Sequence, residues 1–168
     1  MLGIDRSSPP PGAWNEATRA AVELVQGDLV ELEIGPHVQG ADVVFHLAAL
    51  PGVRSSWHRF DEYLRDNVLA TQRLLEACVA GGVRRVVIAS SSSVYGEGAA
   101  TQMSEERCPA PVSPYAVTKL AAEQLALAHA ARADTALEVL VLRFFTVYGP
   151  GSATTCGSPG RRRGLPGF

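Results

Sequence analysis

Residues 83–93 have the sequence VRRVVIASSSS, a short apolar run that ends in four consecutive serines. Val86-Val87-Ile88-Ala89 predicts a buried strand, because continuous apolar residues are typical of strands covered on both faces. In open parallel α/β sheets, ligands bind beyond the carboxyl ends of the strands. The serines follow this strand at that end, so we expect them to lie at a binding site.

A second motif, Tyr115-Ala-Val-Thr-Lys119, lies 22 residues beyond Ser93. Ser113-Pro114 predicts the start of a helix, as N-cap and first-turn proline. A tyrosine and a lysine four apart share one helix face, and the ammonium should lower the pKa of the phenol. Such a phenol can take a proton from an alcohol while hydride leaves the same carbon for a nicotinamide. By itself, the pair of Tyr115 and Lys119 also fits an ordinary amphipathic helix. The serines at the strand end favour the interpretation as a functional site.

Apolar runs alternate with helical patterns along the chain. The predicted strands are 2–4, 22–25, 41–47, 83–89 and 137–145, and the predicted long helices are 60–79 and 114–133. This alternation is typical of right-handed βαβ units, so it predicts an α/β fold with a doubly wound parallel sheet.

Composition narrows the class of protein. The chain has 168 residues, of which 46% are hydrophobic and 19% charged, which is typical of one soluble globular domain. A net charge of −2 argues against nucleic-acid binding. We expect no membrane span and no signal peptide. Cys78, Cys108 and Cys156 have neither metal-ligand nor redox spacing, so the sequence predicts no metal site and a reducing, cytoplasmic location.

Residues 2–151 resemble the NAD-dependent epimerase/dehydratase family, within the extended short-chain dehydrogenase/reductases. The resemblance implies a Rossmann-like NAD(P)-binding domain over residues 1–151. Four groups of residues carry it: Gly27-Asp28-Leu29; Phe45-His46-Leu47-Ala48-Ala49; Asp66-Asn67-Val68 with Leu74 to Ala77; and Ser90 to Gly96 with Tyr115, Lys119 and the run Leu142 to Pro150.

The resemblance also implies NAD as the cofactor. Asp5 would hold the adenosine ribose, and an acidic side chain there favours NAD over NADP. Asp28 and Leu29 would lie along the adenine, and Asn67 would organise the site. The other implied cofactor residues are Leu47, Ala48 and Ala49 beneath the phosphates, with Ser90, Tyr115, Lys119 and Phe144.

The resemblance implies a catalytic serine four residues before the tyrosine of the Val-Tyr-Gly triplet. That tyrosine is Tyr95, so the position falls on Ser91. Tyr115 would be the general base and acid, assisted by Lys119. Dehydratases carry an Asp-Glu pair where this chain has Ser92 and Ser93, which cannot act as acid and base in eliminating water. The chain therefore resembles a UDP-sugar 4-epimerase that works through a 4-keto intermediate.

The loop of residues 51–57 resembles the substrate loop of nucleotide-sugar 4-epimerases, particularly those acting on UDP-glucuronate. Arg54 would meet a carboxylate or phosphate of the substrate there, and a plain surface arginine fits equally well. The other implied substrate contacts are Ser91, Ser92, Phe145 and Thr146. A homodimer is a possible assembly.

The chain departs from the family pattern in two places. It has no Gly-x-x-Gly-x-x-Gly loop, and the strand that would precede the loop is central in such a sheet. We therefore expect the strands on either side either to pair directly or to leave a gap. Residues 152–168 are rich in glycine, proline and arginine and predict a disordered tail in place of a substrate domain. Two alternatives stay open: a non-catalytic fragment or nucleotide-binding module, and a dehydratase, decarboxylase or reductase of the same family.

Overall fold

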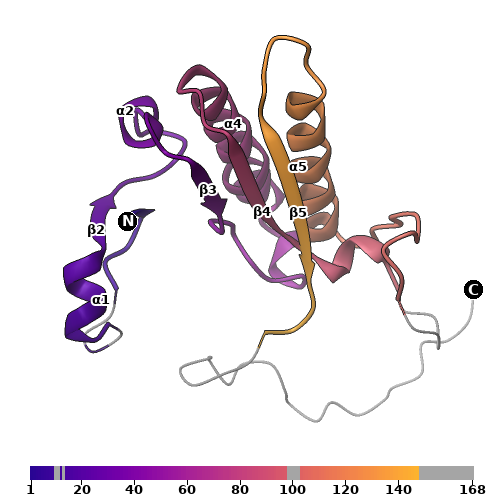
Figure 1. Ribbon diagram of the computed structural model, residues 1–168. Helices are drawn as coiled ribbons and strands as arrows, with labels where there is room; N and C mark the ends of the chain where they lie inside the picture. The colour runs from indigo at the N-terminus through magenta and orange to yellow at the C-terminus, as the bar shows by residue number, and fades with distance from the viewer. Residues whose placement is uncertain (10–11, 13, 98–102, 148–168) are drawn as a thin grey trace, which may run out of the picture.

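The computed structural model describes residues 1–9, 12, 14–97 and 103–147. Their strands form two parallel sheets, β1-β2 and β3-β4-β5 (Figure 1). The bounds are β1 Leu2–Asp5, β2 Glu23–Gln26, β3 Val43–His46, β4 Arg85–Ser91 and β5 Glu138–Phe144. The predicted α/β fold with parallel strands is confirmed. The predicted tail at 152–168 lies outside the described residues.

A gap separates the two sheets, because β1 and β3 are not hydrogen-bonded to each other. Of the two expected arrangements, the structure therefore has the one in which the flanking strands do not pair. Each of these strands presents an edge of unpaired backbone groups. Ion pairs cross between the two parts, from Arg6 to Asp66 and from Arg65 to Asp28.

Helices cover one face of the larger sheet, where α4 (Ala70–Ala80) and α5 (Pro114–Ala130) lie side by side (Figure 1). The helical segment predicted at 60–79 is present in three parts: α3 (Phe60–Tyr63), the π-helix η2 (Leu64–Leu69) and α4. A π-helical turn often marks a functional site. Here it carries Asp66 and Asn67.

Two short helices were not predicted: α1 (Glu16–Ala21), capped by Asn15, and α2 (Gly35–Val38). The first corrects the predicted strand 22–25. Val22 ends α1, and its amide donates to the Thr18 carbonyl at 3.1 Å, so β2 begins one residue later.

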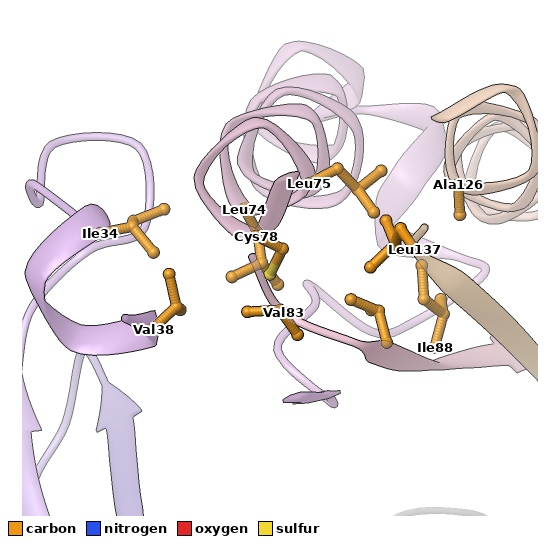
Figure 2. Packing of buried hydrophobic residues seen from close by; sticks show 10 residues of the cluster. Ile34, Val38, Leu74, Leu75, Cys78, Val83, Ile88, Ala126 and Leu137 are labelled. Atoms are coloured by element: carbon orange, nitrogen blue, oxygen red, sulfur yellow. The ribbon is translucent and has the colours of Figure 1, made fainter. Parts of the chain in front are cut away.

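The core joins α2, α4, α5 and the larger sheet (Figure 2). Cys78 is fully buried, and burial raises the pKa of its thiol to about 12. It is therefore a packing residue. The cluster consists of Ile34, Val38, Leu74, Leu75, Cys78, Val83, Val86, Ile88, Ala126 and Leu137.

The other face of the larger sheet is open in the described residues. Parallel register aligns Phe45 with Val87 and Leu140, and Ser91 with Phe144. Phe45 is 65% exposed and Leu140 is 50% exposed.

Candidate active site

Helix α5 begins as the sequence predicts. The Ser113 hydroxyl accepts a hydrogen bond from the Ala116 amide at 3.2 Å, and Pro114 occupies the first turn. This cap fixes the helix start and so places Tyr115 and Lys119 on one face, one turn apart. That face turns towards β4 and the short 3₁₀ helix η3 (Ser92–Tyr95).

Tyr115 lies against Tyr63, with ring centroids 6.2 Å apart and an edge-to-face angle of 82°. Burial raises the pKa of Tyr115, and its hydrogen bond with the Ser91 side chain only partly opposes this. The expectation that Lys119 lowers the pKa of this phenol is therefore wrong for the chain by itself. Burial disfavours the phenolate more than its neighbours favour it.

Lys119 is 6% exposed, and burial lowers the pKa of its ammonium to about 8, against the opposing effect of the Glu123 carboxylate. It is also the only lysine in the sequence. An ammonium with this pKa is mostly charged at pH 7 and loses its proton as the pH rises through about 8. The side chain is thus suited both to binding hydroxyl oxygens and to stabilising a phenolate.

The neighbouring serines Ser90 and Ser91 have different surroundings. Ser91 ends β4 and caps η3, where its hydroxyl accepts from the Ser93 amide at 3.2 Å. It is also the serine that interacts with Tyr115. Ser90 is 5% exposed and donates instead to Glu123. The structure therefore brings Ser91 to Tyr115, places Lys119 one turn further along the same helix, and pairs Ser90 with Glu123.

Glu123 and Arg143 form a buried ion pair that the sequence analysis missed. Arg143 Nη2 lies 2.8 Å from Glu123 Oε2, and the guanidinium carbon lies 4.8 Å from the centre of the Tyr95 ring. Two signals for it are present in the sequence. Glu123 lies four residues after Lys119 on the same helix face, and Arg143 interrupts the apolar run of β5. Together with Ser90, the pair joins α5 to the ends of β4 and β5 next to the candidate site.

Asn67 is 1% exposed and connects the π-helical turn to its surroundings. Its side chain accepts from the Leu50 amide at 2.6 Å and donates to the Thr118 hydroxyl at 3.1 Å. The side chain therefore fixes the loop after β3 to the helix that carries Tyr115. This arrangement is consistent with the organising role that the resemblance implies.

His46 is a second buried polar group near the site that was not predicted. Its Nε2 lies 2.8 Å from the Thr71 hydroxyl, whose own proton goes to the Asn67 carbonyl, so Nε2 must be the donor. Burial and the charge of Lys119 lower the pKa of His46 to about 4. The imidazole is neutral at physiological pH and leaves Lys119 as the cation.

A pocket of about 110 Å³ lies between the two sheets, at the carboxyl ends of β1 and β3. Among the residues that line it are five implied cofactor residues: Asp5, Asp28, Leu29, Ala48 and Ala49. Acidic groups suit ribose hydroxyls, and alanines allow close approach. These residues fit the adenosine half of a dinucleotide, although the glycine-rich loop of the family pattern is absent from the sequence.

The other predicted residues are more exposed. Leu47 is 66% exposed and lies outside the lining of this pocket. Arg54 is exposed, on a loop that Tyr63 holds through contacts of its hydroxyl with the carbonyls of Pro51 and Gly52 at 2.6 and 2.8 Å. Phe144 ends β5 opposite Ser91. Phe145 and Thr146 are exposed just beyond it, and Ser92 is half-buried in η3.

No cluster of three metal-ligating side chains occurs in residues 1–9, 12, 14–97 and 103–147. Within the same described part of the chain, no helix combines the length and apolarity needed to cross a bilayer.

A parallel α/β sheet with a Ser-Tyr-Lys group at its carboxyl edge defines a Rossmann-like domain of the short-chain dehydrogenase type. Residues 1–162 match the NAD dependent epimerase/dehydratase family, and the chain belongs to that family. The predicted family and fold are thereby confirmed, and so is NAD as the cofactor on which the family depends.

Individual relatives agree with this assignment. The chain is 46% identical over 128 residues to the uncharacterized UDP-glucose epimerase YtcB of Bacillus subtilis (strain 168). The matched region covers 76% of this chain and 40% of that protein. It is similar to the structure of MoeE5 in complex with UDP-glucose and NAD, with a TM-score of 0.80 and 59% identity over 89% of this chain and 47% of that one. For UDP-glucuronic acid 4-epimerase from Bacillus cereus in complex with UDP-glucuronic acid and NAD, the TM-score is 0.76 with 37% identity, over 89% and 49% of the two chains. The chain thus spans about half or less of the length of these relatives.

Proposed function

We propose that this chain is the cofactor-binding part of an NAD-dependent 4-epimerase acting on a UDP-sugar, with UDP-glucuronate as the first substrate to test. The observation that carries the proposal is the hydrogen bond between Ser91, at the carboxyl end of β4, and Tyr115, with the buried Lys119 one turn further along the same helix. The relatives whose names include a UDP-sugar and NAD support the choice of ligands.

In the proposed reaction Tyr115, as phenolate, accepts the proton of the sugar 4-hydroxyl, and Ser91 holds the oxygen by a hydrogen bond. Bound NAD would supply the redox chemistry, as the acceptor of hydride from this carbon and, once reduced, as the donor of that hydride to the other face of the 4-keto sugar. Tyr115 then returns the proton after the 4-keto sugar has turned its other face. Because burial raises the pKa of Tyr115, a charged Lys119 next to it is needed to reach the phenolate.

The environment of Ser92 and Ser93 supports epimerisation over dehydration. Both residues lie in η3 directly after Ser91, and neither side chain can act as the acid or base that loss of water requires. Cytoplasmic location and a homodimer also remain predictions. An apolar groove lined by Trp57, Phe60, Val112 and Val117 supports testing the assembly by light scattering.

The test combines binding and turnover by the full 168-residue chain. Titration calorimetry with NAD measures the cofactor site, and proton NMR of UDP-glucuronate incubated with NAD follows formation of the 4-epimer. We expect both signals, and we expect Tyr115→Phe to abolish the second while keeping the first. Turnover that is equal in this variant would refute the role of the phenol.

The second candidate is a nucleotide-binding module without turnover. Burial raises the pKa of the Tyr115 phenol, and this supports a chain that binds the cofactor without turnover, because it disfavours the phenolate base. NAD binding with no 4-epimer formed from either UDP-glucuronate or UDP-glucose is its expected result.

A further inference from the structure

Arg6 directly follows Asp5, the residue implied to hold the adenosine ribose. The two residue types indicate different cofactors, NAD for the aspartate and NADP for the arginine. An acidic group at this position accepts the ribose hydroxyls of NAD, whereas a nearby arginine accommodates the 2′-phosphate of NADP. The preference therefore depends on whether the Arg6 guanidinium is available to a ligand.

The structure shows that Arg6 is already paired. Its Nη1 donates to Asp66 Oδ2 at 2.8 Å, and it lies 3.9 Å from Asp28 Oδ2. The Asp66 side chain is 11% exposed, and it sits on the π-helical turn facing the pocket that Arg6 also lines. The Arg6 guanidinium would have to turn from Asp66, or be shared with it, in order to contact a phosphate.

The second arginine at this end of the pocket is paired as well. Arg65 Nη1 lies 2.8 Å from Asp28 Oδ2 and 3.0 Å from Asp66 Oδ1, and Nη2 lies 2.9 Å from Glu31 Oε1. The Arg65 pairing contributes to lowering the pKa of Asp28, so that this carboxylate stays charged. With Asp5, the group has four carboxylates and two guanidiniums, a local charge of −2.

We propose that Asp66 is a specificity-determining residue, which holds Arg6 away from the ribose and so makes this pocket discriminate against 2′-phosphorylated dinucleotides. The inference rests on the proposed cofactor site. A 2′-phosphate would bring further negative charge into a region that is already negative, where both guanidiniums are paired with carboxylates. Asp5 contributes to the same discrimination, and its carboxylate is oriented by the Ser7 amide at 2.8 Å.

The experiment is calorimetric titration of the full chain with NAD and with NADP, in wild type and Asp66→Asn. We expect wild type to bind NADP at least about ten-fold more weakly than NAD. Asp66→Asn should reduce this ratio about ten-fold, mainly through tighter NADP binding. The double variant Arg6→Gln/Asp66→Asn should return to the wild-type ratio, because the gain depends on the released guanidinium.

Asp61→Asn is the matched control, since it removes one negative charge from the exposed start of the same helical segment. It should leave both affinities unchanged. Circular dichroism checks that each variant folds, and Asp66→Ser replaces Asp66→Asn if the latter does not.

Two results would overturn the inference while leaving the cofactor site intact: a ratio in Asp66→Asn within two-fold of wild type, or an equal gain in the double variant. If wild type and all variants bind neither dinucleotide, the proposed cofactor site itself is refuted, and this inference with it.

Discussion

Arg143 donates to both carboxylate oxygens of Glu123, at 3.1 Å to Oε1 from Nε and 2.8 Å to Oε2 from Nη2, and Glu123 is only 1% exposed. Breaking a buried pair by removing one partner is strongly destabilising, because the other charge stays buried and unpaired. We predict that Arg143→Met lowers the free energy of unfolding by about 3–5 kcal/mol.

Urea denaturation measures this change, with Arg85→Met as control. Arg85 pairs with Glu138 on the surface, and its removal should cost no more than about 1 kcal/mol. Equal effects of the two substitutions would mean that the buried pair contributes no more than a surface pair.

Lys119 should titrate with a midpoint near 8, as its burial indicates. Because it is the only lysine, uniformly ¹³C-labelled lysine gives one set of side-chain signals to follow by NMR. We predict that Glu123→Gln lowers this midpoint, since the carboxylate favours the charged form. A wild-type midpoint above 10 would contradict the observed burial.

The same pKa predicts a rise in stability with pH. Between pH 8 and the unfolded value of 10.5, the unfolded chain binds a proton at Lys119 that the folded chain does not. The free energy of unfolding should therefore increase from pH 8 to pH 10, by at most about 3 kcal/mol. Lys119→Met should abolish this rise in urea denaturation curves, and a variant with an unchanged slope would refute the assignment.

His46 predicts a loss of stability in acid. Its pKa is lowered from 6.5 to about 4, so between these values the unfolded chain binds a proton that the folded chain excludes. The free energy of unfolding should fall as the pH falls through this window, by at most about 3 kcal/mol from this residue. His46→Gln should show a shallower fall between pH 6.5 and 4.5. Parallel curves for the two proteins would exclude His46 as the cause.

Gly96, which follows η3, has a backbone φ of +79°, and a Cβ there would collide with the Ala110 carbonyl oxygen. Gly40 has a similar φ of +76° with nothing within 4 Å of a built Cβ. We predict that Gly40→Ala costs about 1–2 kcal/mol for backbone strain alone, and that Gly96→Ala costs about 1–3 kcal/mol more through overpacking. Thermal denaturation compares them, and equal melting temperatures would show that the loop at Ala110 yields freely.

The long elements were predictable because their signal is local. The apolar run of β4 and the spacing along α5 define a buried strand and an amphipathic helix without knowledge of their neighbours. Helices α1 and α2 were not predictable in this way, because they have six and four residues and only Val38 between them is buried. A helix this short has no periodic apolar face to detect.

The residues of the candidate site could be proposed from the sequence, whereas their electrostatics could not. Tyr115, Lys119 and Ser91 follow from motif and register, whereas the direction of the pKa shift of Tyr115 depends on burial by residues distant in sequence, such as Tyr63. The pairing of Arg6 with Asp66 joins residues 60 positions apart, so it could not be predicted from the sequence either.

The separation of the two sheets implies that the chain opens in parts. Strand β4 is paired on both sides, and Val86 and Ile88 are almost fully buried, so amide protons in β4 should exchange with deuterium only on global unfolding. Strands β1 and β2 form a two-stranded ladder held to the rest partly by ion pairs that salt screens, so their protection should be lost first and earlier at high ionic strength. The pocket between the two sheets would then be the part that a ligand orders, and the candidate site at the end of β4 the part already rigid.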